Sequence, residues 1–446
     1  MVNNKKYKSS DVLTRTYFGI LLFIFGGIVL HAPITVCLST LWPQYELLFK
    51  SWKEILMLLA GVIALYLLYV NKKMQILRDP IIFVIGGYGV LHLVMMGYNF
   101  TGVSSSLAGL AIDLRYVLYF GLVYIAMRLY PEYRQMFIKV GAVGALIVFI
   151  FAILQVFVLP YDILKYLGYS KDTIIPYLVV DQNYNFIRIN STLRGPNPLG
   201  AYASIILSLV VVFIAKRKLK KDARSYLLAS TLSIGGLVAL WASYSRSALV
   251  GLIISAVIIV SVIHFRRIST KIWLGLGVLV IVVLGGIYAL RNTDFVANVL
   301  LHDNPNSVVS VKSNDGHINS LQDGLKQMVN QPLGAGVGST GSASLYSAKP
   351  EIIENQYLFT AHEVGWFGLI LFIYIFSLVM FNLWKLRQDW LALGVVVGGI
   401  SLALVGLLLP VWVDDTVSIV WWGSAAVVIG SKWHIVDSRG KKHGKR

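Results

Sequence analysis

Runs of about twenty apolar residues recur along almost the whole of this 446-residue sequence. Each run is long enough to cross the roughly 30 Å hydrocarbon core of a bilayer as a helix. The composition agrees, because 57% of the residues are hydrophobic and only 13% are charged, which is about half the charged fraction of a soluble protein. A β-barrel would alternate apolar and polar residues instead of forming continuous runs. The sequence therefore predicts an all-α polytopic membrane protein.

The hydropathy pattern predicts about twelve transmembrane helices. Their expected bounds are 17–41, 53–70, 81–98, 107–128, 138–159, 197–215, 226–243, 247–264, 272–290, 361–383, 390–410 and 416–431. The first run follows four basic residues, as in a signal peptide, but it is too long and lacks a clear small-residue cleavage site. We therefore interpret it as an uncleaved span. The single cysteine, Cys37, excludes an internal disulfide.

Basic residues gather on alternate loops. If the N-terminus is cytoplasmic, the inner segments hold 27 of the 39 Lys and Arg residues but only 6 of the 21 Asp and Glu residues. The positive-inside rule therefore places both termini in the cytoplasm. The net charge of +18 includes the stretch KRKLKKDAR (216–224) and follows this topology, so it does not indicate nucleic-acid binding. Contact with anionic lipid is the remaining interpretation of these clusters.

This orientation divides the chain into six parts. They are a cytoplasmic N-terminus (1–16), five transmembrane helices (17–160), an outer loop followed by four transmembrane helices (161–290), a large extracytoplasmic loop (291–360), three transmembrane helices (361–431) and a basic cytoplasmic tail (432–446). The large loop is too polar to span a membrane, and long loops between rigid elements are commonly functional.

Three arginines depart from this charge pattern, because they fall on the outer face. Arg188 and Arg194 lie in RINSTLRGPNPLGAY, and Arg246 lies in the short outer turn of SYSRSALVG. An arginine near bilayer depth costs on the order of 3 kcal/mol unless it pairs or snorkels, so snorkelling is one interpretation of Arg246. A shared anionic partner explains all three, since arginine donates bidentate hydrogen bonds to phosphate. The start of the next span would turn its amides toward the same ligand. We therefore predict a diphosphate site at the outer surface.

The large outer loop adds two titratable candidates. His317 lies in DGHINSLQDGL and Glu354 lies in EIIENQYLF. Either side chain could accept a proton from a hydroxyl nucleophile. The alternatives are a solvated surface or helix-cap histidine for His317, and an exposed neighbour of a helix cap for Glu354.

Two further motifs in the outer segments predict structure and not chemistry. GVGSTG (336–341) fits the pattern G-x-G-x-x-G, but a dinucleotide site needs a strand before it and a helix after it, so we expect tight turns or close approach to a ligand. The pair Asp414–Asp415 has no third metal ligand within reach in the sequence. We interpret that pair as an exposed turn and predict no metal site.

Charged residues also fall inside predicted spans. Asp113 and Arg115 lie in the fourth span at i and i+2, where they do not face each other, so each should pair with another helix. Charges at membrane depth are often functional. Glu363 lies at the predicted outer mouth of the tenth span, where it would frame the same pocket.

Four sequence blocks together resemble the O-antigen ligase / polysaccharide polymerase superfamily of bacterial membrane proteins. In order, they are RINSTLRGPNPLGAY, SYSRSALVG, GHINSLQDGLKQMVNQPLGAGVGSTGSAS and ENQYLFTAHEVGWFGLILF. Their order, spacing and outer-face location all agree with the family. The resemblance covers about residues 185 to 380.

The resemblance implies a glycosyltransferase of the GT-C type in the bacterial plasma membrane. Such enzymes move a glycan from undecaprenyl diphosphate at the outer leaflet to a hydroxyl of another glycan, without a cofactor or an obligatory metal. The implied partners are an undecaprenyl-diphosphate-linked oligosaccharide, an acceptor glycan, the lipid bilayer and other polysaccharide-assembly proteins, but not nucleic acid. By the same resemblance, Arg188, Arg194 and Arg246 match the arginines that hold the diphosphate.

One departure from the family bears on the reaction. Many members have a His-Asn pair where this chain has Glu354–Asn355, so the role of base falls to Glu354 or moves to His317. The departure favours a polymerase of capsular, exopolysaccharide or O-antigen repeat units. An O-antigen ligase that attaches glycan to lipid A, wall or protein is the first alternative. A flippase for lipid-linked oligosaccharides is the second, although the sequence lacks the internal repeat typical of transporters.

The predicted site follows from these assignments. Arg188, Arg194 and Arg246 stabilise the charge that grows on the leaving diphosphate, and Glu354 accepts the proton of the attacking hydroxyl. Polar contacts of second rank to sugar or phosphate are expected from Asn197, Asn355 and Tyr357.

Overall fold

The computed structural model describes residues 2–180, 183–216, 223–264, 285, 288–293, 296, 313–347 and 350–433. The side chains of residues 2–10, 264 and 313–320 lie outside this description. Across the described residues the fold is mostly helical, with a single two-stranded sheet. The predicted all-α membrane class is confirmed.

The first half of the chain forms six long helices joined by short 3₁₀ segments. They are α1 (Val2–Gly27), η1 (Ile28–Leu30), α2 (His31–Leu41), η2 (Pro43–Tyr45), α3 (Glu46–Val70), η3 (Met74–Arg78), α4 (Pro80–Tyr98), α5 (Val103–Leu129), η4 (Pro131–Tyr133), α6 (Arg134–Phe157) and η5 (Ile163–Leu167). The break at η1 precedes Pro33, whose missing amide removes one helical hydrogen bond, to the carbonyl of Val29.

The second half begins with the sheet and continues with the helices that carry the sequence blocks. They are β1 (Tyr177–Val180), β2 (Asn183–Ile189), α7 (Pro196–Lys216), α8 (Ala223–Ser243), α9 (Arg246–His264), α11 (Ser313–Asn330), α12 (Gly341–Ser344), α13 (Gln356–Lys385), α14 (Trp390–Val405) and α15 (Asp415–Ser431). Several starts are capped, because the side chains of Asn355, Asp389 and Asp414 accept backbone amide hydrogens of the first helical turn.

Nine helices among the described residues are long and apolar enough to cross a membrane. They span Asp11–Leu41, Pro43–Val70, Pro80–Tyr98, Val103–Leu129, Pro131–Phe157, Pro196–Lys216, Ala223–Ser243, Arg246–Ile263 and Gln356–Lys385. Each coincides with a predicted span. The predicted spans 390–410 and 416–431 correspond to the shorter helices α14 and α15, of 16 and 17 residues. The predicted span 272–290 lies almost entirely outside the described residues, so a total of twelve stays a prediction.

Small residues allow the central helices to approach closely. The helix α15 packs along α5, and α14 packs along α7. A Cβ atom on Gly430 of α15 would lie 2.9 Å from the backbone oxygen of Tyr124 in α5, so this contact requires glycine. Beside it, Trp412, Trp421 and Trp422 are completely or almost completely buried and pack against one another in tilted and edge-to-face arrangements. This core holds α15 in the centre of the bundle.

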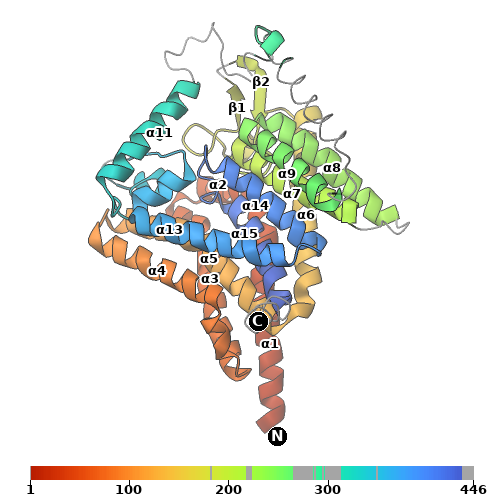
Figure 1. Cartoon of the computed structure of the whole chain (residues 1–446), viewed down its shortest axis with the longest axis vertical. Helices are drawn as coiled ribbons and strands as arrows, with labels where there is room; N and C mark the ends of the chain where they lie inside the picture. The colour runs from red at the N-terminus through yellow and green to blue at the C-terminus, as the bar shows by residue number, and fades with distance from the viewer. Residues whose placement is uncertain are drawn as a thin grey trace, which may run out of the picture.

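The two-stranded sheet lies at one end of the molecule. Strands β1 and β2 pair antiparallel, with Leu178 opposite Arg188. Figure 1 shows this hairpin near α11, at the opposite end of the molecule from the start of α1. The predicted outer segments 160–196 and 291–360 therefore share one end of the fold, at least in their described parts.

Candidate functional site

The hairpin brings the first arginine to the second sequence block. Arg188 on β2 donates from Nε to the backbone oxygen of Ser243, 2.8 Å away, and from Nη2 to Oδ1 of Asn197, 2.6 Å away. Ser243 ends α8, and Asn197 is in the first turn of α7. Two blocks that are far apart in the sequence therefore meet through one guanidinium group.

A tight turn places the second arginine at a helix start. Tyr244 takes a left-handed conformation with φ 48°, and Arg246 is the first residue of α9. Gly200 of α7 packs against this turn so closely that a Cβ atom there would lie 2.7 Å from Cβ of Ser245. Arg246 is partly buried. The N-terminal ends of α7 and α9 are thus held beside each other. Free amides, which attract anions, come mainly from α9, because Pro196 and Pro198 of α7 have none and the amide of Leu199 donates to Gly195.

Arg194 lies on the turn that enters α7. Ser191, with φ 50°, fixes this turn against α6, because its amide donates to Gln155 and its hydroxyl donates to the backbone oxygen of Val148. Arg194 itself is exposed, and it is close enough to Lys53 and Asp414 to act on both electrostatically. Of the three predicted diphosphate arginines, Arg188 thus lies on β2, Arg194 on the turn that enters α7 and Arg246 at the start of α9. The described contacts link Arg188 to the turn before Arg246, whereas those of Arg194 lead to Lys53 and Asp414.

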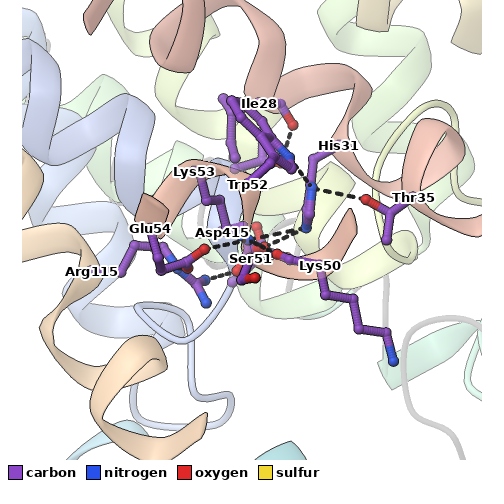
Figure 2. A network of polar contacts seen from close by, with 12 residues as sticks. Ile28, His31, Thr35, Lys50, Ser51, Trp52, Lys53, Glu54, Arg115 and Asp415 are labelled. Atoms are coloured by element: carbon purple, nitrogen blue, oxygen red, sulfur yellow. Dashed lines mark hydrogen bonds and ion pairs between the residues drawn. The ribbon is translucent and has the colours of Figure 1, made fainter. Parts of the chain in front are cut away.

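Figure 2 shows a buried cluster of charges that includes Lys53, on which Arg194 acts electrostatically. Arg115 of α5 donates from Nε to Oε1 of Glu54, 2.7 Å away, and also pairs with Asp415 at the start of α15. Nζ of Lys53 lies 3.0 Å from Asp415 and 3.4 Å from Glu54. Nε2 of His31 lies 2.9 Å from Oδ2 of Asp415. We call these five residues the ion cluster.

The ion cluster is balanced in charge and sheltered from solvent. Two cations face two carboxylates, and the side chains of Lys53 and Arg115 are only 2% and 6% exposed. Such a buried network is costly to disrupt, because a lost partner leaves an unpaired charge in a medium of low dielectric constant. Figure 2 shows Asp415 in the middle of the group. This carboxylate therefore joins α2, α3 and α5 to α15.

Two sequence predictions are tested by this cluster. Arg115 and Asp113 do pair with other helices, as expected: Asp113 faces Glu363 of α13 and lies 3.8 Å from Nε2 of His92 in α4. The prediction that Asp414–Asp415 is an exposed turn is wrong. Asp415 is 19% exposed and ion-paired, whereas Oδ1 of Asp414 caps α15 by accepting from the amide of Val417.

Lys53 and Glu54 had not been identified from the sequence. The predicted span began at residue 53, so both residues were treated as its boundary, but α3 begins at Glu46 and carries them into the bundle. The sequence feature that could have identified them is a pair of opposite charges inside a continuous helical stretch, two turns from its start.

Removing the charge of Asp415 should destabilise the protein. We expect Asp415→Asn to lower the free energy of unfolding by roughly 1.5–3 kcal/mol, because three charged or polar neighbours lose a charge-assisted partner. Thermal unfolding of the purified protein in detergent measures the change. A loss below about 0.5 kcal/mol would show that the ion cluster does not hold α15.

The neighbouring residue provides a matched control. Asparagine is an equally good N-cap, so Asp414→Asn should keep α15 intact. Burial raises the pKa of Asp414, so its ionised form costs stability as the pH rises above the ordinary value of about 3.9. The amide removes that cost, and the variant should be at least as stable as the parent at pH 7. The difference should vanish below the ordinary carboxyl pKa.

The start of α13 holds three of the predicted residues. Oδ1 of Asn355 accepts from the amides of Tyr357 and Leu358, and its Nδ2 donates to the backbone oxygen of Leu407. The hydroxyl of Tyr357 donates to the backbone oxygen of Ala403, 2.9 Å away. Both side chains therefore bind the scaffold, which fixes α13 against α14 and the loop that leads to Asp414. Glu354 is half-buried and immediately precedes this cap.

The glycine-rich stretch forms a tightly packed loop beside the same helix. Gly336 and Gly338 have φ 103° and 80°, and Cβ atoms there would lie 2.0 and 2.1 Å from the backbone oxygens of Asn99 and Ser105. The predicted tight turns are confirmed. Glu363, which is 1% exposed, accepts from the amide of Thr340 in this loop and does not line an open mouth. The loop covers the kink in α13, where Gly365 has φ 68°.

His317 lies on α11, but its side chain is outside the described residues. The helix α11 packs on α13, and Gly324 approaches the side chain of Leu358. Among the described residues, no group of three or more His, Cys, Asp or Glu side chains could hold a metal ion.

Comparison with known proteins locates the family in the same part of the chain. Residues 231–373 match the family model described as O-antigen ligase, which spans the turn before Arg246, the glycine-rich loop and the start of α13. No curated protein matches the chain. The family indicates a glycosyl-transferring enzyme in general, with a lipid-linked glycan and an acceptor as substrates in a membrane. Residues 231–373 are therefore similar to the O-antigen ligase family, and this match supports the resemblance to the O-antigen ligase-like superfamily.

Proposed function

We propose that this protein polymerises lipid-linked repeat units of a capsular polysaccharide, exopolysaccharide or O-antigen. It takes the growing glycan from undecaprenyl diphosphate at the outer face of the bacterial plasma membrane and transfers it to a hydroxyl of a second glycan. The observation that carries the proposal is the contact of Arg188 with both Asn197 and the end of α8. It links the start of α7 to the turn before α9, which supports a cationic site at the end of the bundle that carries the hairpin.

Transfer at this site breaks one bond and forms another. The acceptor oxygen attacks the anomeric carbon of the donor sugar, and the bond from that carbon to the diphosphate oxygen breaks. The electron pair leaves with the diphosphate. Arg188, Arg194 and Arg246, together with the amides at the start of α9, stabilise its charge, and fixed cations at such a place lower the barrier by several kcal/mol. Glu354 takes the proton of the attacking hydroxyl.

The ion cluster is linked to this proposed site through Arg194. Arg194 acts electrostatically on Lys53 and Asp414, so the cluster contributes to the field that the diphosphate would meet. Because the cluster itself is balanced, the exposed arginine supplies the net positive charge. Asn355 and Tyr357 hold the segment that carries Glu354, and we propose that their side chains act through this scaffold.

A ligase is the second candidate, and the family description favours it. Polymerase and ligase differ only in the acceptor, so the glycan made by a deletion strain separates them. Single repeats in a gel would indicate a lost polymerase, whereas intact free chains would indicate a lost ligase.

Purified protein tests the enzymatic proposal against transport. Lipid-linked repeats mixed with the protein in detergent should become longer lipid-linked chains with release of undecaprenyl diphosphate. A flippase could not do this, since detergent offers no two sides to move lipid between. Substrate that stays unchanged, at protein concentrations where the fold is verified, would contradict the proposal.

A further inference from the structure

A cavity of about 410 Å³ lies between α6, α7, α8, α14 and α15, away from the arginines. Its walls are apolar and include Phe137, Ala145, Leu209, Phe213, Leu228 and Val427. Its volume is in the range of sites that bind small molecules. An apolar cavity of this size would stay dry and would lose dispersion contacts if it were empty, so a hydrocarbon chain from the bilayer is a suitable occupant.

The polar residues of the cavity lie mostly at one end. Gln135 and Lys139 are in the first two turns of α6, and Ser225 is in the first turn of α8. Lys139 lines the cavity and its side chain is exposed. Trp390, at the start of α14, closes the same end. These helix ends are the ones that the charge distribution predicts to be cytoplasmic.

The surroundings of this end carry an excess of positive charge. Asp389 is paired with Arg134 at 2.7 Å and with Lys432, and these two cations lower the pKa of its carboxyl group. Nζ of Lys216, at the end of α7, donates to the backbone oxygen of Arg387. The acidic residue is therefore already paired, and Lys139 supplies a positive charge in the lining of the cavity.

The position of the polar end indicates from which leaflet a lipid would enter the cavity. The helix α7 runs from Asn197, beside the arginines, to Phe213 in the cavity wall, so the two sites lie at opposite ends of this helix. A polyprenyl donor has its phosphates at the arginine end. An occupant whose charged group meets Lys139 must enter from the other leaflet.

We propose that this cavity is a binding site for an anionic phospholipid of the inner leaflet. One acyl chain fills the space between α6 and α8, and the phosphate lies beside Lys139. The site is separate from the transfer site and does not depend on the proposed reaction.

Binding of defined phospholipids to the delipidated protein in detergent tests this site by native mass spectrometry. Phosphatidylglycerol should bind at one molecule per protein and more tightly than phosphatidylcholine with the same chains. Lys139→Glu should remove this preference, a change of at least about fivefold, since one cation near a membrane surface contributes about 1 kcal/mol. Lys73→Glu, at an exposed lysine on the same predicted side but outside the cavity, is the control and should change nothing.

Filling the cavity tests the position of the acyl chain. Ala142→Trp on α6 or Ala229→Trp on α8 should abolish binding of both lipids, whereas Val143→Trp should not, because Val143 is 55% exposed and does not line the cavity. Two tryptophan variants guard against one that fails to fold. Equal binding of the two lipids by the parent protein would overturn the proposal. The proposal would also be overturned if Lys73→Glu reduced the lipid preference as much as Lys139→Glu. It would equally be overturned if an isoprenoid phosphate were the only lipid that co-purified with the protein.

Discussion

Replacing Arg246 by alanine is expected to lower the rate of glycan transfer by roughly 10²–10³-fold, the usual effect of removing one preorganised group that stabilises a developing anion. Arg246 begins α9 beside the turn that contacts Arg188, so its loss removes charge from the place where both helix starts converge. Lysine at this position keeps the charge but loses the planar fork, and Arg246→Lys should retain only part of the rate. Release of undecaprenyl diphosphate by purified protein measures the effect.

The matched control is an arginine elsewhere on the same predicted face. Arg291 is exposed, follows the predicted ninth span and stacks over the ring of Tyr288. Arg291→Ala should transfer glycan at the parental rate. Full polymer from the Arg246→Ala variant, at normal expression and with an unchanged melting temperature, would exclude the phosphate role.

Replacing Glu354 by glutamine should lower kcat by roughly 10²–10⁴-fold, because a positioned general base contributes a factor of this size. Glu354 is held by the cap of α13, whose Asn355 hydrogen bonds do not involve the Glu354 carboxyl group, so the substitution should leave the helix start intact. KM for the donor should change little, since the proposal assigns binding of the diphosphate to the arginines and not to Glu354. In the parent, kcat should fall as the pH drops and the carboxylate is protonated.

The alternative base is His317, and the same assay separates the two. His317→Ala should keep the parental rate if Glu354 is the base. The acidic limb of the pH profile should also disappear in the glutamine variant and persist in the histidine variant. A large loss with His317→Ala and a small one with Glu354→Gln would transfer the role to the histidine.

Hydropathy predicted the helices well because burial in lipid requires continuous apolar runs and satisfied backbone hydrogen bonds. It could not predict the β1–β2 hairpin, since four and seven residues of extended chain carry little periodic signal within a long loop. It also could not predict the kink at Gly365, which depends on how closely the glycine-rich loop packs against α13. Both features arise from tertiary contacts and not from local sequence preference.

In the candidate site, too, some residues can be predicted from the sequence, whereas others depend on tertiary contacts. Arg188, Arg194 and Arg246 can be identified from the sequence because they depart from a charge rule, and the structure joins Arg188 to Asn197, another predicted site residue. Asn355 and Tyr357 have polar side chains that a sequence cannot distinguish from ligand contacts, yet they bind backbone groups. Asp415 was assigned to a turn, because its partner Arg115 is on a helix far away in the sequence.

The residues of the ion cluster are synthesised at different times, so the cluster can form only when the end of the chain has been inserted. Lys53, Glu54 and Arg115 enter the membrane early in translation, but the carboxylate that joins them belongs to the last described helix. Until that helix is synthesised, the charged groups of the earlier helices lack one partner. Snorkelling, water or the translocation machinery has to stabilise them during this time. Nascent chains that stop before α15 should therefore be preferred targets for membrane proteases. Pairing of Asp415 with Lys53 and Arg115 would then mark the complete chain for quality control.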